Sequence, residues 1–176
     1  MATATVDDVL IDTNVLLEAT DERRRYHADA VALLESGAAF TVSAQVIREY
    51  LAVATRPVTA NGLGLPMADA LANVREFRRD IRLLPEERPV LPSFLDLLAR
   101  IPCSGKRVHD AHIVATAIAH RVRTIVSLNP DDLSGFTPNV AVITPSQALG
   151  HRGPPTVREP APRWRAAGRR SRARSP

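Results

Sequence analysis

Short apolar runs alternate with segments of helical periodicity along most of the chain, and this alternation limits the folds that the sequence can adopt. We expect strands at residues 6–11, 39–42, 81–84, 124–128 and 140–143. Helices are expected to start at residue 13 and to cover residues 25–35, 43–53, 66–79, 91–100, 109–121 and 145–149. Strands that alternate with helices favour parallel pairing. The sequence therefore predicts an α/β fold of three layers, in which helices flank a central, mostly parallel sheet of about five short strands.

A chain of 176 residues is expected to form one domain with a core that is stable without disulfides. Its single cysteine, Cys103, excludes a disulfide within the chain and a zinc cluster built from cysteines. No apolar stretch approaches the roughly 18 residues of a membrane span, and no basic segment precedes an apolar core at the N-terminus. We therefore expect a soluble, cytoplasmic protein.

The formal net charge of +4 is distributed unevenly. Residues 150–176 hold eight arginines and one glutamate, a charge of +7, whereas the other 149 residues hold 15 basic and 18 acidic residues, a charge of −3. The basic segment is also rich in Pro, Gly, Ser and Ala. We predict a folded domain over residues 1–150 and a disordered tail over residues 151–176. The tail either contacts nucleic acid or reflects the preference of this chain for arginine over lysine.

Asp12 stands at the end of the first expected strand and before a helix start. In open α/β sheets, ligands bind outside the carboxyl ends of the strands, so a carboxylate at this place is positioned for chemistry. Aspartate is also a good helix N-cap, which is the alternative interpretation of Asp12.

Other acidic or amide residues fall at comparable places in the predicted fold. Glu49 lies in the helix after the second strand, Asp110 in the first turn of the helix at 109–121, and Asn129 and Asp132 after the strand at 124–128. We expect these side chains and Asp12 to converge on one cleft. Carboxylates that gather without matching Lys or Arg repel one another unless a cation is present. Hard divalent cations such as Mg²⁺ take oxygen ligands, and they assist phosphodiester cleavage in many nucleases.

Each of these residues also has an ordinary structural interpretation. Glu49 follows Arg48 and could be a solvated helix residue, and Asp110 could stabilise the start of its helix. Asn129 before Pro130 is a common turn opener. The joint occurrence, in the right order of elements, favours a shared site.

Four segments resemble the motif blocks of PIN-domain ribonucleases, and most closely those of the VapC-type toxins of bacterial toxin–antitoxin pairs. The segments are VLIDTNVLL, TVSAQVIREYLAVATRP, GKRVHDAHIVATAIAHRV and IVSLNPDDLSGF, and the resemblance covers roughly residues 8–149. It implies a PIN-like fold and an endoribonuclease that depends on Mg²⁺ or Mn²⁺ and leaves 5′-phosphate and 3′-hydroxyl ends. It also implies three partners: an RNA substrate, a cognate VapB-type antitoxin and a second copy of the chain in a homodimer.

The resemblance assigns site residues by their positions in these blocks. The implied metal ligands are Asp12, Glu49, Asp110 and Asn129, and Asp132 joins them in the implied catalytic set. The residues implied to lie at the substrate are Thr13, Asn14 and Ser127, and we expect His109 at the edge of the site. Family members often carry an acid where this chain has Asn129, whose amide oxygen can bind a metal or its water without contributing charge.

Three alternatives remain open from the sequence. His109 and His112 share a helix face and could bind zinc, although no third ligand has matching spacing. The chain could be a non-catalytic PIN-like module that binds RNA or protein. A phosphatase or receiver-type domain would need a second acid beside Asp12, where Thr13 and Asn14 stand, and a nearby lysine; Lys106 is the only lysine in the chain.

The arginines at 23–25 are either part of a solvated turn or a contact for RNA phosphates.

Overall fold

The central sheet consists of five short parallel strands. A computed structural model of the chain describes residues 8–86, 89–136 and 140–150. In these residues the strands are β1 (Val9–Ile11), β2 (Phe40–Ser43), β3 (Ile81–Leu84), β4 (Thr124–Val126) and β5 (Ala141–Ile143). They pair in parallel in the order β3-β2-β1-β4-β5, with β1 at the centre. The predicted α/β fold is therefore confirmed, and all of its strand pairs are parallel.

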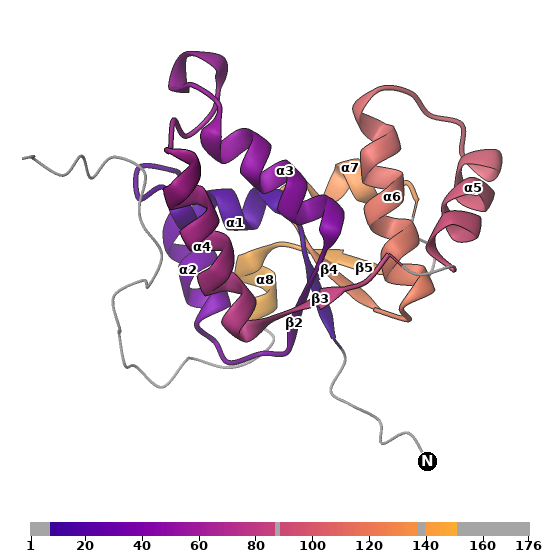
Figure 1. Cartoon of the computed structure of the whole chain (residues 1–176). Helices are drawn as coiled ribbons and strands as arrows, with labels where there is room; N and C mark the ends of the chain where they lie inside the picture. Colours follow the sequence, from indigo (N-terminus) through magenta and orange to yellow (C-terminus); the bar gives the residue numbers. More distant parts are fainter. Residues whose placement is uncertain (1–7, 87–88, 137–139, 151–176) are drawn as a thin grey trace, which may run out of the picture.

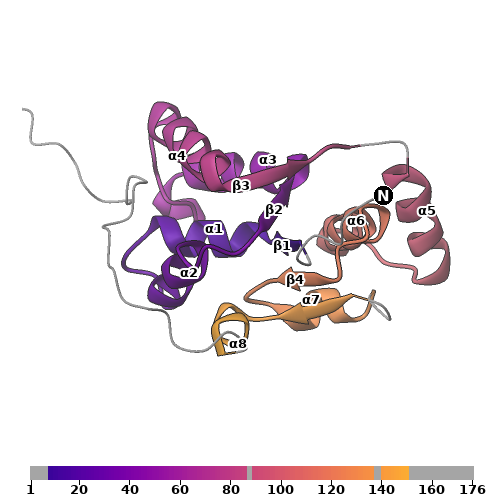
Figure 2. The ribbon, with the colours of Figure 1, turned by 90° about the horizontal axis from the view of Figure 1, so that it is seen from below.

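Helices cover both faces of this sheet (Figure 1). The described helices are α1 (Thr13–Thr20), α2 (His27–Leu34), α3 (Ala44–Thr55), the 3₁₀ turn η1 (Val58–Ala60), α4 (Met67–Asp80), α5 (Val90–Arg100), α6 (Lys106–Ala119), α7 (Pro130–Ser134) and α8 (Pro145–Gly150). Figure 2 shows α1 to α4 on one side of the sheet and α5 and α6 on the other. This division follows from right-handed crossovers, because the chain first moves outward from β1 to β3 and then returns to place β4 on the opposite side of β1.

The order of strands creates a switch point between β1 and β4. Strands β2 and β3 extend the sheet from one side of β1, and β4 and β5 extend it from the other. The connections that leave the carboxyl ends of β1 and β4 therefore diverge, and the crevice between them is the usual ligand-binding place in parallel α/β sheets. Asp12 directly follows β1, and Ser127 directly follows β4.

The three central strands, β1, β2 and β4, are largely buried as the apolar runs predicted, whereas the edge strands β3 and β5 are partly exposed. Leu10, Ile11, Val42, Ile125 and Val126 have no exposed surface. This pattern is expected of parallel strands that are covered by helices on both faces.

A second, polar part of the core ties α1, α3 and α4 together. The Tyr50 hydroxyl lies 3.1 Å from Thr20 Oγ1 and accepts a hydrogen bond from Asn73 Nδ2 at 3.0 Å. Thr20 Oγ1 also donates to the Leu16 carbonyl at 2.8 Å. The Tyr50 ring packs edge-to-face on Phe77, with the ring centres 5.4 Å apart. Three buried polar side chains thus satisfy one another inside the helical layer.

One predicted helix boundary is wrong in a way that affects the site. Helix α6 begins at Lys106 and not at His109, so Asp110 lies in the second turn and not in the first. The chain enters the helix at Gly105, whose φ of +59° is readily adopted only by glycine. Asp110 therefore does not stabilise the start of its helix, and that structural interpretation is excluded.

Other boundaries differ by a few residues. Strand β4 ends at Val126, so Ser127 and Leu128 belong to the loop that follows. Helix α2 begins at His27 and leaves the arginines at 23–25 in the preceding turn. The residues predicted at the start of the first strand, 6 and 7, lie outside the described residues, as does the tail at 151–176. Within the described ranges, no helix is both long and apolar enough to cross a membrane.

Candidate active site

The carboxylate of Asp12 is held by three hydrogen-bond donors at the switch point. Its Oδ1 accepts from the Thr13 backbone N–H at 2.6 Å, as an N-cap of α1. Its Oδ2 accepts from Ser127 Oγ at 2.7 Å and from Asn14 Nδ2 at 2.8 Å. Asp12 therefore caps a helix and is also fixed from the loop after β4, so the capping interpretation is correct but incomplete.

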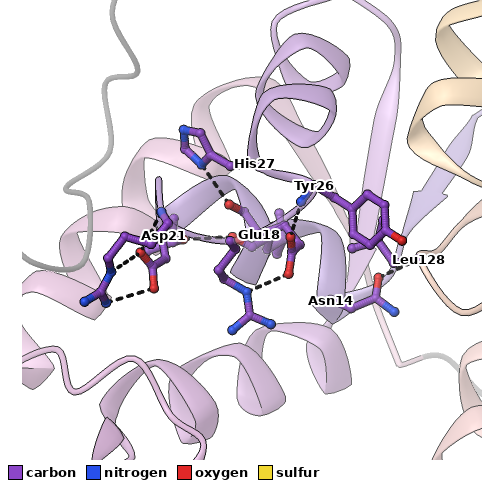
Figure 3. Close-up of polar contacts among 10 residues, drawn as sticks. Asn14, Glu18, Asp21, Tyr26, His27 and Leu128 are labelled. Atoms are coloured by element: carbon purple, nitrogen blue, oxygen red, sulfur yellow. Dashed lines mark hydrogen bonds and ion pairs between the residues drawn. The ribbon is translucent and has the colours of Figure 1, made fainter.

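Asn14 and Ser127 connect the start of α1 to the loop that follows β4. The Oδ1 atom of Asn14 accepts from the Leu128 backbone N–H at 3.0 Å, which Figure 3 shows. The buried Ser127 hydroxyl accepts from Asn14 Nδ2 at 3.0 Å and from the Asn129 N–H at 3.1 Å. Both residues, predicted to lie at the substrate, are thus engaged in holding Asp12 in one orientation.

Glu49 is brought beside this cluster by α3. Its Oε2 accepts from Thr13 Oγ1 at 3.0 Å, and its Oε1 accepts from Gln45 Nε2 at 2.7 Å. The side chain is 34% exposed. Glu49 is therefore tied to α1 through Thr13, and it is not a freely solvated helix residue.

Asp110 is the third carboxylate of the site and is only 9% exposed. Burial raises its pKa, and the charges of Asp132 and Glu49 act in the same direction, whereas Lys106 and His109 oppose them. Asp110 is therefore within electrostatic reach of carboxylates from α3 and α7.

The pKa of Asp12 is raised from 3.8 to about 6. Burial is the main cause, and the hydrogen bonds from Ser127 and Thr13 offset part of it. The negative charges of Glu49 and Asp110 raise this pKa further. Asp12, Glu49 and Asp110, which are far apart in the sequence, thus repel one another in the fold. We refer to these three residues below as the acidic triad.

A lysine at the edge of the triad partly compensates this charge, which corrects the expectation of acids without a matching cation. Lys106 Nζ donates to Asp132 Oδ2 at 3.3 Å, and its side chain is 74% exposed. Partial burial lowers the pKa of Lys106, but the hydrogen bond with Asp132 and the charges of Asp110, Asp132 and Asp12 raise it overall.

Asn129 and Asp132 of the last sequence block and His109 of the third block are exposed. Asn129 is exposed, and its side chain makes no capping hydrogen bond to α7. Asp132 is also exposed and pairs with Lys106. His109 is 67% exposed, and its Nδ1 lies 3.7 Å from Glu49 Oε1. Of these three predicted residues, His109 lies near Glu49 and Asp132 pairs with Lys106, and the Asn129 N–H bonds Ser127 Oγ.

The donors at this site fit a hard divalent cation better than a zinc ion. In the described part of the chain, no three His, Cys, Asp or Glu side chains are close enough together to enclose a metal ion. The predicted four ligands therefore do not form a closed cage. Mg²⁺ commonly uses only one or two carboxylates and completes its shell with water and phosphate oxygens, so an open, all-oxygen site suits it. His109 and His112 do not belong to a cluster of the kind that zinc requires.

The turn before α2 uses its charges internally. Arg24 pairs with the buried Glu18 at 2.6 Å, and Glu18 also accepts from the Tyr26 N–H at 2.7 Å (Figure 3). Arg23 pairs with Asp21 at 2.9 Å and, against the effect of burial, lowers the pKa of that carboxyl. The charges of both arginines are thus used in ion pairs with acids at the C-terminal end of α1.

Sequence reasoning missed Gln45 and His112 as parts of the site. Gln45 Nε2 bonds Glu49, and Gln45 Oε1 lies 2.5 Å from His112 Nδ1. Gln45 precedes Glu49 by four residues on α3, and neighbours at that spacing share a helix face, so this pair could have been found. The contact with His112 depends on the packing of α3 against α6, which the sequence does not show.

Comparison with known proteins identifies the class to which this fold and site belong. Residues 9–134 match the family model of the PIN domain, so the chain belongs to the PIN-domain family. Among curated protein sequences, none matches this chain.

Several solved structures share the fold at low sequence identity. VapBC2 from Rickettsia felis, bound to a DNA fragment from its promoter, is 15% identical with a TM-score of 0.60, over 78% of this chain and 98% of that chain. FitAcB from Neisseria gonorrhoeae is 21% identical with a TM-score of 0.58, over 78% and 98%. VapC20 from Mycobacterium tuberculosis, a toxin that cleaves the sarcin–ricin loop, is 16% identical with a TM-score of 0.58, over 76% and 98%.

Proposed function

We propose that this chain is a Mg²⁺- or Mn²⁺-dependent endoribonuclease and the toxin of a VapBC-type toxin–antitoxin pair. The observation that carries the proposal is the acidic triad, in which three elements bring carboxylates into mutual repulsion at the carboxyl edge of β1. Membership of the PIN-domain family and the likeness in fold to VapC20 support it. Mutual repulsion of half-buried acids destabilises a fold, and a bound cation would offset that repulsion.

Asp12, Glu49 and Asp110 would hold the cation, and Asn129 and Asp132 at the rim would complete its surroundings from the side of the RNA. A bound divalent cation lowers the pKa of water and stabilises the charge on a phosphodiester. The chain itself supplies orientation, because Ser127 and Asn14 fix the Asp12 carboxylate. Burial raises the pKa of both Asp12 and Asp110 in the metal-free protein, and a bound cation would lower both again, so that the two carboxylates would be ionised ligands when it is present.

We expect the purified protein to cleave RNA in the presence of Mg²⁺ or Mn²⁺, and a chelator should stop the cleavage. The Asp12→Asn variant should cleave at least about 100-fold more slowly. The products should carry 5′-phosphate and 3′-hydroxyl ends, which end-labelling can read. Circular dichroism of the variant serves as the control for folding. Folded wild-type protein that leaves varied RNAs intact with both metals would contradict the proposal and favour a non-catalytic PIN-like binding module.

The proposed partners follow from the same assignment. Structural neighbours include toxin–antitoxin complexes, among them one from Klebsiella pneumoniae, which supports a VapB-type antitoxin for this chain. We infer that the protein acts on RNA in the cytoplasm as a homodimer. Co-expression with the adjacent reading frame should yield a complex that does not cleave RNA, and light scattering of the free toxin should give twice the mass of one chain.

A further inference from the structure

A single buried carboxamide connects the two helices that carry Glu49 and Asp110. Gln45 is 5% exposed, and it lies in the first turn of α3. Its Nε2 donates to Glu49 Oε1 at 2.7 Å and to the backbone carbonyl of His109 at 3.0 Å. Its Oε1 lies 2.5 Å from His112 Nδ1. The amide therefore contacts its own helix once and α6 twice.

The chemistry of these partners fixes the orientation of the amide. A carboxylate and a backbone carbonyl can only accept hydrogen bonds, so they require the NH₂ group and exclude the flipped amide. The oxygen must then face His112, which in turn must carry a proton on Nδ1 to donate. Both Nε2 protons and the oxygen are thus engaged, and the amide has one arrangement that satisfies all its partners.

His112 is itself anchored on its other sides. Its ring packs edge-to-face on Phe94, with the ring centres 5.1 Å apart, and its Nε2 lies 3.3 Å from Glu86 Oε1, a contact that is attractive only when both ring nitrogens carry protons. The ring is only 19% exposed, so it is held between α5 and the segment after β3. The acceptor group of Gln45 therefore meets a fixed donor and not a mobile surface side chain.

The position of these contacts relates them to the acidic triad. Glu49 lies one helical turn after Gln45, and the carbonyl that Gln45 bonds belongs to the residue directly before Asp110. One amide group thereby touches the Glu49 carboxylate and the backbone that carries Asp110. Its length and polarity therefore bear on the placement of both acids.

We propose that Gln45 is the positioning residue that sets the Glu49 carboxylate relative to Asp110, by bridging α3 to α6 through its buried amide. The inference rests on the proposed function, because it assigns to Gln45 a role at the proposed metal site. Residues that orient metal ligands without touching the metal typically change affinity or activity by 10–100-fold when they are replaced.

The test compares Gln45→Met with Asn73→Leu. Methionine retains the length of glutamine without its hydrogen bonds. Asn73 is a buried amide that bonds Tyr50 in the helical layer and not the triad, so its replacement reproduces the loss of a buried amide alone. Each protein is measured for thermal unfolding, for Mn²⁺ affinity by electron paramagnetic resonance, and for cleavage under single-turnover conditions at saturating RNA.

We expect Gln45→Met to weaken Mn²⁺ binding about 10-fold and to slow cleavage at least as much, while Asn73→Leu lowers the melting temperature and leaves both unchanged. Gln45→Asn keeps the amide but shortens its reach, and we expect an intermediate loss, which also covers the case in which the methionine variant fails to fold. Wild-type affinity and rate in a folded Gln45 variant would overturn the inference, as would equal losses in the Asn73 variant.

The Mn²⁺ measurement separates this inference from the proposed function. Wild-type protein that binds Mn²⁺ but cleaves no RNA would refute the nuclease, and the affinities would still decide the role of Gln45. Wild-type protein that binds no Mn²⁺ would overturn the inference about Gln45, since there would be no metal site to organise.

Discussion

Two polar clusters lie at the two ends of α1, and they use buried hydrogen bonds for opposite purposes. At its C-terminal end Thr20, Tyr50 and Asn73 form a neutral network in which donors meet acceptors. At its N-terminal end Asp12, Asn14 and Ser127 form an equally tight network around a carboxylate that two other carboxylates repel. The first network stabilises the fold, whereas the second holds in place a charge that the fold would be more stable without.

The largest effect that would distinguish the clusters is the pH dependence of Asp12. The folded protein raises the pKa of this group from 3.8 to about 6, so its stabilising contribution is complete below about pH 4 and is lost as the pH rises through about 6. In metal-free protein, Asp12→Asn removes this loss. We expect the unfolding free energy of the variant, relative to wild type, to rise by about 2 kcal/mol between pH 4 and pH 7.

Urea unfolding at a series of pH values, in the presence of a chelator, measures this difference. Subtracting the two proteins cancels the contribution of Asp21, which lies at the other end of α1, whereas Asp110 is coupled to Asp12 and its contribution remains in the difference. A difference that stays constant with pH would contradict the raised pKa of Asp12 and the contrast with the neutral cluster.

The neutral cluster should respond in stability and not in chemistry. Tyr50→Phe removes the hydroxyl that accepts from Asn73 and contacts Thr20, and it leaves the edge-to-face packing on Phe77. We expect a loss of about 1–2 kcal/mol in unfolding free energy, because a buried donor loses its acceptor. Cleavage per folded molecule should be unchanged, and a slower rate at equal folded fraction would show that the two ends of α1 are coupled.

The smallest effect concerns Lys106 at the rim of the triad. Its ammonium group pairs with the exposed Asp132 and feels the charges of Asp110 and Asp12. Lys106→Met removes a cation that opposes metal binding, so we expect Mn²⁺ affinity at low salt to rise about 2- to 3-fold. Stability should change by less than about 1 kcal/mol, as for other exposed ion pairs.

Titration calorimetry at two salt concentrations, with Lys106→Arg as the charge-conserving control, measures the effect on affinity. Weaker Mn²⁺ binding in the methionine variant would mean that Lys106 organises the acids instead of competing with the cation. Such a result would make the charged cluster resemble the neutral one, in which every partner supports the others.

The fold could be predicted because its signals are local. Apolar runs of strand length, separated by segments of helical periodicity, specify parallel pairing without knowledge of any contact. The same signals placed Asp12 at the end of β1. They did not show that α6 begins at Lys106, because glycine can adopt a positive φ but does not have to, so Gly105 alone does not mark a helix start. That error moved Asp110 by one helical turn.

The candidate site could be predicted only in part, because its partners come from different elements. Glu49 and Asp110 follow from the order of elements, yet the hydrogen bond from Thr13 to Glu49 and the effect of the Lys106 charge on Asp110 depend on how α1, α3 and α6 are placed relative to one another. Ser127 was expected near the substrate, and the structure shows it donating to Asp12.

The sequence by itself determined the order of strands and helices, the membership of the PIN-domain family and the acids at the carboxyl edge of the sheet. Only the tertiary structure decided which of these acids are buried, which cation stands beside them, and that Gln45 bridges the two helices that carry Glu49 and Asp110. The reason is physical: periodicity along the chain records which face of an element is apolar, whereas pKa values and hydrogen-bond partners depend on distances between elements that are far apart in sequence.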